Sequence, residues 1–382
     1  MNSDERDVVY MDHAATSPLR PSALAAMMPW LDGLYGNPSG AHFVARRAKR
    51  AIEDARDHIA GVIGRHPLEL VFTSGGTEAN NHVVRAAARS ARGRIVVSAV
   101  EHHAVLEPAH DLDASVVAVD SDGRVDLAAL QASLVGDVAL VSVMAANNET
   151  GVLQPLADVA RIVRRHAPTA WLHTDAVQAA PWLDVSELAE NVDSMSVSAH
   201  KLGGPQGVGL LVVPRGLRIP PLLLGGGQER EMRSGTHNVA GIIGFAAAFV
   251  EAASERAATS AAVGALRDTL ERSILERVDG VRRTLNANVE RLPNNSHLCF
   301  AGIESEALVF LLDRAGVCAS AASACSSGGV VVSHVLQAMG VPHEWAAGAL
   351  RLTLGPQTSE REVRRTVESV AGAVDQLREA GS

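Results

Sequence analysis

Short apolar runs alternate with amphipathic segments between about residues 67 and 213. The runs are rich in valine, leucine and isoleucine, as in 138–144, and the segments between them place apolar side chains at helical spacing. Strands that alternate with helices in this way predict a largely parallel sheet joined by crossover helices. We therefore predict an α/β fold over this region.

The pattern changes after a long alanine-rich helical stretch at about 241–278. Short strands mixed with helices follow it, which predicts a smaller α+β domain that the N-terminal dozen residues join. We place the large domain at 14–255 and form the small domain from 1–13 together with 256–382. A chain of this length can bury the cores of two domains. The short strands predicted in the small domain are 282–286, 297–301 and 350–354.

One lysine follows directly on a predicted strand. The sequence Ser198-Ala199-His200-Lys201 comes after the strand 192–197 and before the glycine-rich stretch 202–209. This arrangement predicts a tight turn that holds the Lys201 amine in a cleft. Partial burial disfavours the ammonium form, and a neutral amine condenses with aldehydes such as pyridoxal phosphate. On the local spacing alone, a solvated lysine at a strand end is the alternative.

A phosphate-bearing cofactor also needs an anion cradle, and one candidate lies upstream. The segment 73–81 follows the apolar run 68–72 and opens a predicted helix. Backbone amides at the helix start and the Thr77 hydroxyl would point at an anion, and Gly76 lets the backbone approach closely. An ordinary strand-to-helix turn is the alternative.

Further polar residues end other predicted strands. Asp175 ends an apolar run, and a carboxylate buried there needs a cationic partner such as a protonated pyridine nitrogen. Gln178 and Asn148 are placed to hydrogen-bond the phenolic oxygen of the same ring. His102 is placed to stack on that ring or to move protons, and a structural histidine is the alternative. For Asn148, ordinary turn chemistry is the alternative. Because strand ends meet at one edge of a parallel sheet, these residues and Lys201 predict a single ligand site.

An arginine and a cysteine in the C-terminal third add candidate chemistry. Arg351 lies within a predicted strand, where its fork of donors matches a substrate carboxylate, the alternative being an edge-strand arginine that faces water. Cys299 and Cys318 fall in apolar, strand-like contexts typical of inert thiols. Cys325 lies among small residues at 320–329, which predicts a thiol on a mobile loop that can enter the cleft.

Composition restricts the class of protein. The net charge of −9 argues against broad electrostatic binding to nucleic acid. Three cysteines make no disulfide framework, and the absence of a Cys-x-x-Cys cluster gives no metal site, so we expect a reducing cytoplasm. No N-terminal signal is visible, and no apolar run approaches the ~20 residues that cross a bilayer. We therefore expect a cytoplasmic protein without membrane, nucleic-acid or metal partners.

A set of motifs recurs in one order along the chain. They are Tyr-Met-Asp-His-Ala-Ala-Thr at 10–16, Gly-Asn-Pro-Ser at 36–39, the turn at 73–81, Glu-His-His at 101–103, Asn-Asn-Glu at 147–149, Asp-Ala-Val-Gln at 175–178, the lysine motif at 198–209, and Gly-Gly-Gly-Gln-Glu-Arg at 225–230. With these motifs the chain resembles the pyridoxal-phosphate-dependent cysteine desulfurases of the iron–sulfur-cluster and nitrogen-fixation type, within the class V aminotransferase group. The resemblance spans nearly the whole chain and implies the fold type I architecture of pyridoxal-phosphate-dependent transferases.

The resemblance implies a role for each residue around the cofactor. Lys201 would form the covalent link with the cofactor aldehyde and move the Cα proton of the substrate. Asp175 would pair with the pyridine nitrogen, and His102 would stack on the ring. The residues that would hold the phosphate are Gly76, Thr77, Ser198 and His200.

The resemblance also implies a homodimer with shared sites, because Thr236 would reach the phosphate of the neighbouring subunit. Arg351 and Asn37 would bind L-cysteine, and Cys325 would attack its sulfur, which leaves alanine and a persulfide for an acceptor protein. A selenocysteine lyase, an aminotransferase that does not use the thiol, and a cofactor-bound scaffold are the alternatives. The pathway stays open among iron–sulfur cluster assembly, tRNA thiolation, thiamine or molybdenum cofactor synthesis, and DNA phosphorothioation.

Overall fold

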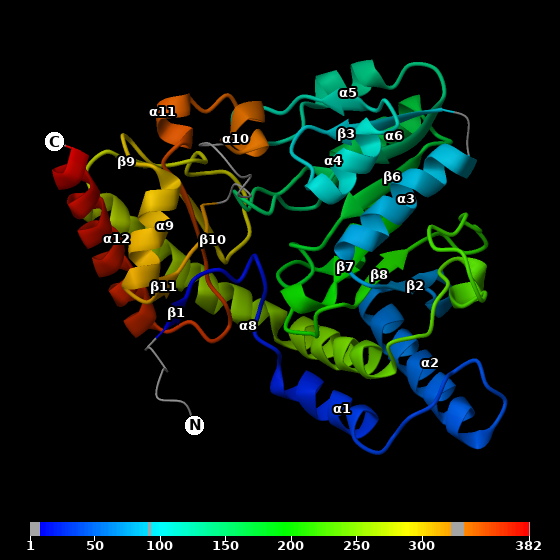
Figure 1. The fold of residues 1–382 in the computed structure, drawn as a ribbon. Helices are drawn as coiled ribbons and strands as arrows, with labels where there is room; N and C mark the ends of the chain where they lie inside the picture. The colour runs from blue at the N-terminus through cyan, green and yellow to red at the C-terminus, as the bar shows by residue number, and fades with distance from the viewer. Residues whose placement is uncertain (1–7, 91–92, 322–331, 382) are drawn as a thin grey trace.

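The computed structural model describes residues 8–90, 93–321 and 332–381. Within these ranges a seven-stranded sheet forms the centre of the large part of the molecule, in the order β2-β8-β7-β6-β5-β3-β4 (Figure 1). Strand β8 runs antiparallel to both of its neighbours, and the other neighbouring strands are parallel. The predicted, mainly parallel α/β architecture is confirmed. The strands are β2 (Leu70–Thr73), β3 (Arg94–Ser98), β4 (Ser115–Val117), β5 (Val138–Ser142), β6 (Trp171–Asp175), β7 (Ser194–Ser198) and β8 (Gly209–Val212).

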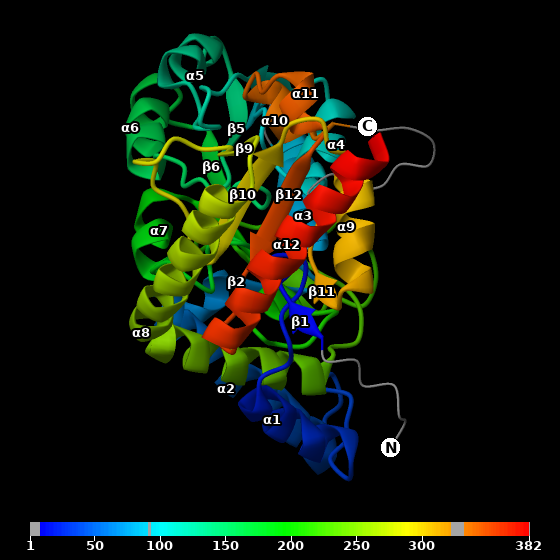
Figure 2. The same cartoon turned by 90° about the vertical axis from the view of Figure 1, so that its left-hand side faces the viewer.

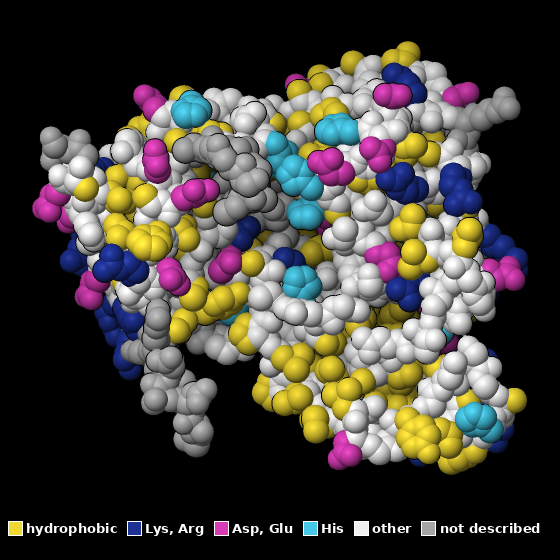
Figure 3. All heavy atoms as spheres, in the orientation of Figure 1, with side chains coloured by type: hydrophobic (Ala, Val, Ile, Leu, Met, Phe, Trp, Pro, Cys, Tyr) yellow, Lys and Arg dark blue, Asp and Glu magenta, His cyan; other side chains and the backbone are white. Residues whose placement is uncertain are grey.

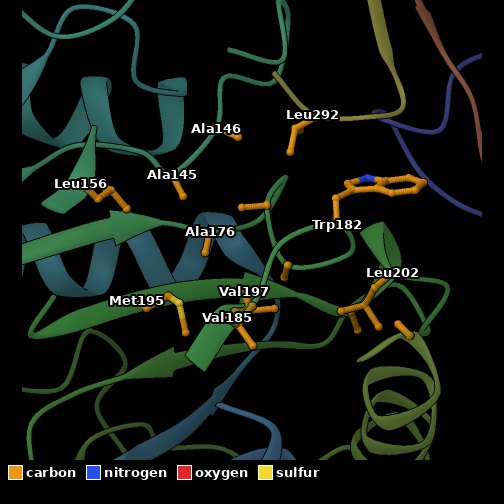
Figure 4. Close-up of a cluster of buried hydrophobic side chains, with 14 of the residues drawn as sticks. Ala145, Ala146, Leu156, Ala176, Trp182, Val185, Met195, Val197, Leu202 and Leu292 are labelled. Carbon is orange, nitrogen blue, oxygen red and sulfur yellow. The ribbon is translucent and has the colours of Figure 1, made fainter. Parts of the chain in front are cut away.

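Apolar side chains alternate between the two faces of this sheet, and each face has its own core. Val96 and Val141 point to one face, where they pack in the cluster that includes α5, α6 and α7. Ile95, Val97 and Leu140 point to the other face, beneath α3 and α4. Figure 4 shows part of the first cluster. The helices are α3 (Gly76–Ser90), α4 (His103–His110), α5 (Leu127–Ser133), α6 (Leu156–His166) and α7 (Val185–Asn191).

A second, smaller sheet lies beside the large one. Strand β10 (Asn295–Phe300) pairs antiparallel with β9 (Val281–Arg283) and with β12 (Ala349–Thr353). The N-terminal strand β1 (Val9–Tyr10) pairs with β11 (Val317–Cys318), so the start of the chain joins this part. Figure 2 shows α12 lying along the small sheet. The helices here are α9 (Ser305–Arg314), α10 (His334–Ala338), α11 (His343–Ala346) and α12 (Glu360–Gly381).

Helix α8 (Val239–Arg277) connects the two parts and packs against α1 (Pro21–Leu31), α2 (Phe43–Ile63) and α12 (Figures 1 and 2). The predicted domain boundary at residue 255 falls inside this continuous helix, so the limits 14–255, and 1–13 with 256–382, stay a prediction. Neither α8 nor any other helix in the described ranges has the length and apolar character needed to cross a membrane.

The first strand of the large sheet begins later than its apolar run predicts. Residues Pro67–Glu69 form a short 3-10 turn, and β2 starts only at Leu70. The imidazole of His66 accepts a hydrogen bond from the Leu68 amide, and the Glu69 carboxylate accepts one from the His66 amide. These two bonds cap the turn and use polar groups that an extended strand would leave unpaired.

Candidate active site

A cavity of ≈290 Å³ opens at the carboxyl edge of the parallel strands. Histidine side chains gather beside the hollow at the centre of the face shown in Figure 3. The structure brings together most of the residues that the sequence predicts for one site. Those that line the cavity are Gly76, Thr77, His102, Asn148, Asp175, Gln178, Ser198, His200, Lys201 and Arg351.

One end of the cavity is built from anion-binding groups. Helix α3 begins at Gly76, so the free amides of its first turn and the Thr77 hydroxyl lie at the positive end of a 15-residue helix. Glycine is needed opposite this turn, because a Cβ on Gly209 would lie 2.6 Å from the backbone of Gly75. Ser198, at the end of β7, lines the same cavity. This donor set fits a phosphate group.

His200, which lines the same cavity, is neutral. Burial lowers the pKa of His200 to about 4, and its Nδ1 lies 3.0 Å from the Thr16 hydroxyl. A neutral imidazole offers one donor and one acceptor rather than a charge. The charge of a bound phosphate is therefore balanced mainly by the helix dipole and by the amides of α3.

Asp175 closes β6 with a carboxylate that is almost completely buried. Its Oδ2 accepts a hydrogen bond from Asn80 Nδ2 at 2.6 Å, and its Oδ1 accepts one from the Val177 amide at 2.9 Å. Burial raises the pKa of Asp175, and the nearby His102 and Lys201 act in the opposite direction. A buried anion of this kind fits the protonated ring nitrogen of a pyridine cofactor.

His102 lies at the N-terminal end of α4, where its Nδ1 accepts the Ala104 amide at 3.0 Å. That bond leaves the ring proton on Nε2 in the neutral form. Burial lowers the pKa of His102, which favours this neutral form. An uncharged aromatic ring on the wall of the cavity is suited to stack on a planar ligand.

The Lys201 amine is held by the N-terminal segment of the chain. Its Nζ donates to the carbonyl oxygens of Ala14 at 2.6 Å and Ala15 at 2.7 Å. The Ala14 carbonyl also accepts a bond from Gln178 Nε2 at 2.9 Å. Burial, with the nearby Arg351 charge, lowers the pKa of Lys201 to about 8. A substantial fraction of the amine is therefore neutral near physiological pH.

Arg351 reaches the cavity from β12 of the small sheet. Its Nη1 donates to the Asn148 carbonyl at 2.9 Å, and its Nη2 donates to Asp12 Oδ1 at 2.8 Å. Its Nε is buried without a hydrogen-bond partner in the described part of the chain. The guanidinium is thus fixed at two atoms and keeps N–H groups free for a carboxylate.

Two of the predicted residues that the structure describes, Thr236 and Asn37, do not line this cavity. Thr236 is exposed on the segment before α8, and Asn37 is exposed between α1 and α2, where its Oδ1 accepts the Ser39 amide. Cys325 lies outside the described residues. Ser320 and Ser333, on either side of that gap, contact groups next to the cavity: Ser320 pairs with the Arg351 backbone, and the Ser333 hydroxyl donates to Glu149.

The sequence alone did not indicate a second buried acid beside Asp175. Glu101 is completely buried, with Oε1 accepting the Met144 amide at 2.5 Å and Oε2 unpartnered among the described residues. Burial and the charge of Asp175 raise the pKa of Glu101 well above its usual value. Its position directly before His102 gave no signal, because only the fold shows how deeply it is buried.

Comparison with known proteins agrees with this geometry. The family described as "Aminotransferase class-V" matches residues 9–366. The "Cysteine desulfurase IscS" of Dictyoglomus turgidum is 42% identical over 97% of this chain and 95% of its own length. The chain belongs to the cysteine desulfurases of the class-V aminotransferase family. The resemblance predicted from the motifs is confirmed.

Solved structures give the same result. A "NifS-like protein" superposes with a TM-score of 0.89 at 36% identity, over 97% of this chain and 100% of that one. A structure titled "SspA in complex with cysteine" has a TM-score of 0.78 at 29% identity, over 92% of this chain and 99% of that one. Enzymes of this family depend on pyridoxal 5'-phosphate, and the phosphate cradle, Asp175 and Lys201 fit that cofactor. The predicted cofactor is confirmed.

Loading of pyridoxal phosphate onto the apoprotein should speed up as the pH rises through about 8 and level off above it. Only the neutral amine attacks an aldehyde, and the pKa of Lys201 is lowered to about 8 by burial and by Arg351. The rate is followed by visible absorbance after mixing apoprotein and cofactor across a pH series. Arg351→Met should move the midpoint to higher pH, and a loading rate independent of pH would contradict the assignment.

Proposed function

We propose that this chain is an L-cysteine desulfurase that stores sulfur on Cys325 and passes it to an acceptor protein. The observation that carries the proposal is one cavity holding the lysine, the buried aspartate, the neutral histidine and the carboxylate-binding arginine that the chemistry requires. Full-length similarity to cysteine desulfurases supports the activity, and a related structure with bound cysteine supports the substrate.

The proposed overall step is balanced without an added oxidant or reductant. The Cβ–S bond of cysteine breaks, a sulfur–sulfur bond forms at the Cys325 sulfur, and a proton at Cβ completes alanine. The thiol of Cys325 becomes a persulfide, and a later acceptor removes the outer sulfur. Contacts of the flanking residues Ser320 and Ser333 beside the cavity support this role for Cys325.

Each residue of the cavity has a separate role in the proposed reaction. Bound pyridoxal phosphate supplies an electron sink for the charge that develops at the substrate Cα. The Lys201 amine takes the Cα proton, which its lowered pKa of about 8 permits near neutral pH. Arg351 orients the substrate carboxylate through N–H groups that its bonds to Asn148 and Asp12 leave free. Asp175 would accept the ring N–H of the cofactor, and His102 would pack on the face of that ring.

A homodimer with shared sites is part of the proposal. Thr236 is exposed and stands away from the cavity of its own chain, as a residue that serves a second subunit would. Exposed apolar side chains on α1 and at the start of α2 supply surface for subunit contact. They are Leu24, Met28, Leu31 and Phe43. Asn37, close to this surface in sequence, is proposed as a substrate-binding residue of the same assembly.

The sulfur acceptor is proposed as a protein of iron–sulfur cluster assembly, tRNA thiolation or DNA phosphorothioation in the cytoplasm. Similarity to a protein named IscS supports the first of these. Selenocysteine lyase and aminotransferase activities are the competing functions. Relative turnover on cysteine and selenocysteine, and amino transfer to a keto acid, separate them from the desulfurase.

Cys325→Ser is expected to abolish the formation of alanine and sulfide from L-cysteine while the bound cofactor keeps its visible absorbance. The serine hydroxyl cannot accept sulfur, whereas the cofactor site is built from other residues. Alanine and sulfide are measured with a reductant present. The matched control is Cys318→Ser, which removes the thiol of β11 and should keep full activity. Full activity in Cys325→Ser would assign the protein to the lyase or aminotransferase reaction instead.

A further inference from the structure

A row of buried polar side chains runs across the sheet behind Asp175. His173, two residues before Asp175 on β6, is the register partner of Ser194 on β7, so the two side chains share a face. Asn80 on α3 covers that face. His173 is completely buried, and Asn80 and Ser194 are 1% and 2% exposed. Burying polar groups at this depth costs free energy unless they hydrogen-bond one another.

These groups form a continuous chain of hydrogen bonds. Ser194 Oγ lies 2.9 Å from His173 Nδ1, and His173 Nε2 lies 3.1 Å from Asn80 Oδ1. Asn80 Nδ2 donates to Asp175 Oδ2 at 2.6 Å. The Ser196 hydroxyl also approaches His173 Nε2, at 3.4 Å. The chain ends at the carboxylate that faces the cavity.

The hydrogen positions along this row of hydrogen bonds follow from the Asp175 carboxylate at its end. An ionised carboxylate only accepts, so the Asn80 amide must donate to Asp175 and present its oxygen to His173. That oxygen needs a donor, which places the imidazole proton on Nε2 and leaves Nδ1 to accept from Ser194. Burial lowers the pKa of His173 to about 3, so the ring stays neutral. In each of these three hydrogen bonds, the donor is therefore the partner that lies farther from Asp175 along the row.

We propose that Asn80 and His173 are positioning residues, which hold Asp175 ionised and in one orientation toward the ring nitrogen of the cofactor. Asn80 supplies a strong donor to a buried anion that burial alone would neutralise. His173 keeps the Asn80 amide from turning its oxygen to Asp175. Asn80 carries no titratable proton, so it also separates the imidazole from the carboxylate. The inference rests on the proposed function only through the pairing of Asp175 with that cofactor.

The test uses the pH midpoint of the visible absorbance change of the bound cofactor, measured on the holoenzyme without cysteine. Asn80→Ala removes the donor, so a shared proton moves from the ring nitrogen toward Asp175. The ring then withdraws less electron density from the Lys201 nitrogen that is joined to it, which raises the pKa of that nitrogen. The midpoint should therefore rise by about half a pH unit or more. The turnover number should fall while KM for cysteine holds, because Arg351 is untouched.

Two variants at His173 separate positioning from packing. His173→Leu removes the donor to Asn80 and should raise the midpoint, whereas His173→Gln keeps an amide N–H and should restore it. Asn294→Ser is the control, since Asn294 is an equally buried asparagine that bonds the Leu354 carbonyl. An unmoved midpoint in Asn80→Ala with cofactor bound, or an equal rise in Asn294→Ser, would overturn the inference. Because cysteine is absent, neither result depends on whether the enzyme is a desulfurase.

Discussion

Lys201→Ala is expected to lower the turnover of cysteine by about 10³-fold or more and to leave pyridoxal phosphate bound only noncovalently. In the proposed mechanism, the variant loses both the amine that links to the cofactor and the base that takes the Cα proton. The cradle at α3 and the Asp175 carboxylate are unchanged, so the cofactor should still bind. Alanine formation gives the turnover, and dialysis against buffer shows the loss of the covalent link.

The sequence offers a clean control for this experiment, because it contains two lysines, Lys201 and Lys49. Lys49 is exposed on α2, and Lys49→Ala should keep full activity. Borohydride reduction of the wild-type holoenzyme, followed by peptide mass analysis, should find the cofactor on Lys201 alone. An adduct on Lys49, or full activity in Lys201→Ala, would remove Lys201 from the mechanism.

Much of the candidate site could be predicted because its residues follow strands directly. Asp175 is the last residue of β6, Ser198 the last of β7, and Lys201 lies three residues further on. His102 and Thr77 come shortly after β3 and β2. Parallel strands deliver such residues to one edge whatever their distance in sequence. Strand recognition was therefore enough to gather them, even where the ends of a strand were misjudged, as at Pro67–Glu69.

The rest depends on contacts between distant segments, which leave no local pattern. The carbonyls of Ala14 and Ala15 meet Lys201 only because β1 pairs with β11 and leads the chain past the cavity. Asp12 reaches Arg351 for the same reason. The row from Ser194 to Asp175 required the register of β6 and β7 as well as the position of α3. A sequence contains these residues, but the fold alone makes them neighbours.

The clearest such case is a buried ion pair between Arg56 on α2 and Glu229. Arg56 Nη2 and Nη1 lie 2.7 and 2.8 Å from the two Glu229 oxygens. The same carboxylate accepts from the Phe72 amide and from His237 Nε2. It anchors a turn in which three successive non-glycine residues, 229–231, have left-handed φ angles of 49°, 57° and 67°. Such a turn persists only where its surroundings hold it.

Arg56→Ala is expected to lower the free energy of unfolding of the apoprotein by about 3–5 kcal/mol. Burial alone would raise the pKa of Glu229, but hydrogen bonds from His237 and Arg56 hold it at about 2. Without Arg56 an anion is left buried with fewer partners, and the left-handed turn loses its main anchor. Urea unfolding followed by circular dichroism measures the loss. At pH 7 the carboxylate is ionised in the wild type, so the comparison reports a broken pair.

A surface ion pair supplies the matched control. Arg364 contacts Glu360 on α12 at 3.5 Å, and both side chains are mostly exposed, so Arg364→Ala should change the free energy of unfolding by at most about 0.5 kcal/mol. Replacing both buried partners, as in Arg56→Met with Glu229→Gln, removes the stranded charge and should recover part of the loss. If Arg56→Ala loses no more stability than Arg364→Ala, the pair does not hold the turn. The left-handed turn at 229–231 would then need another anchor.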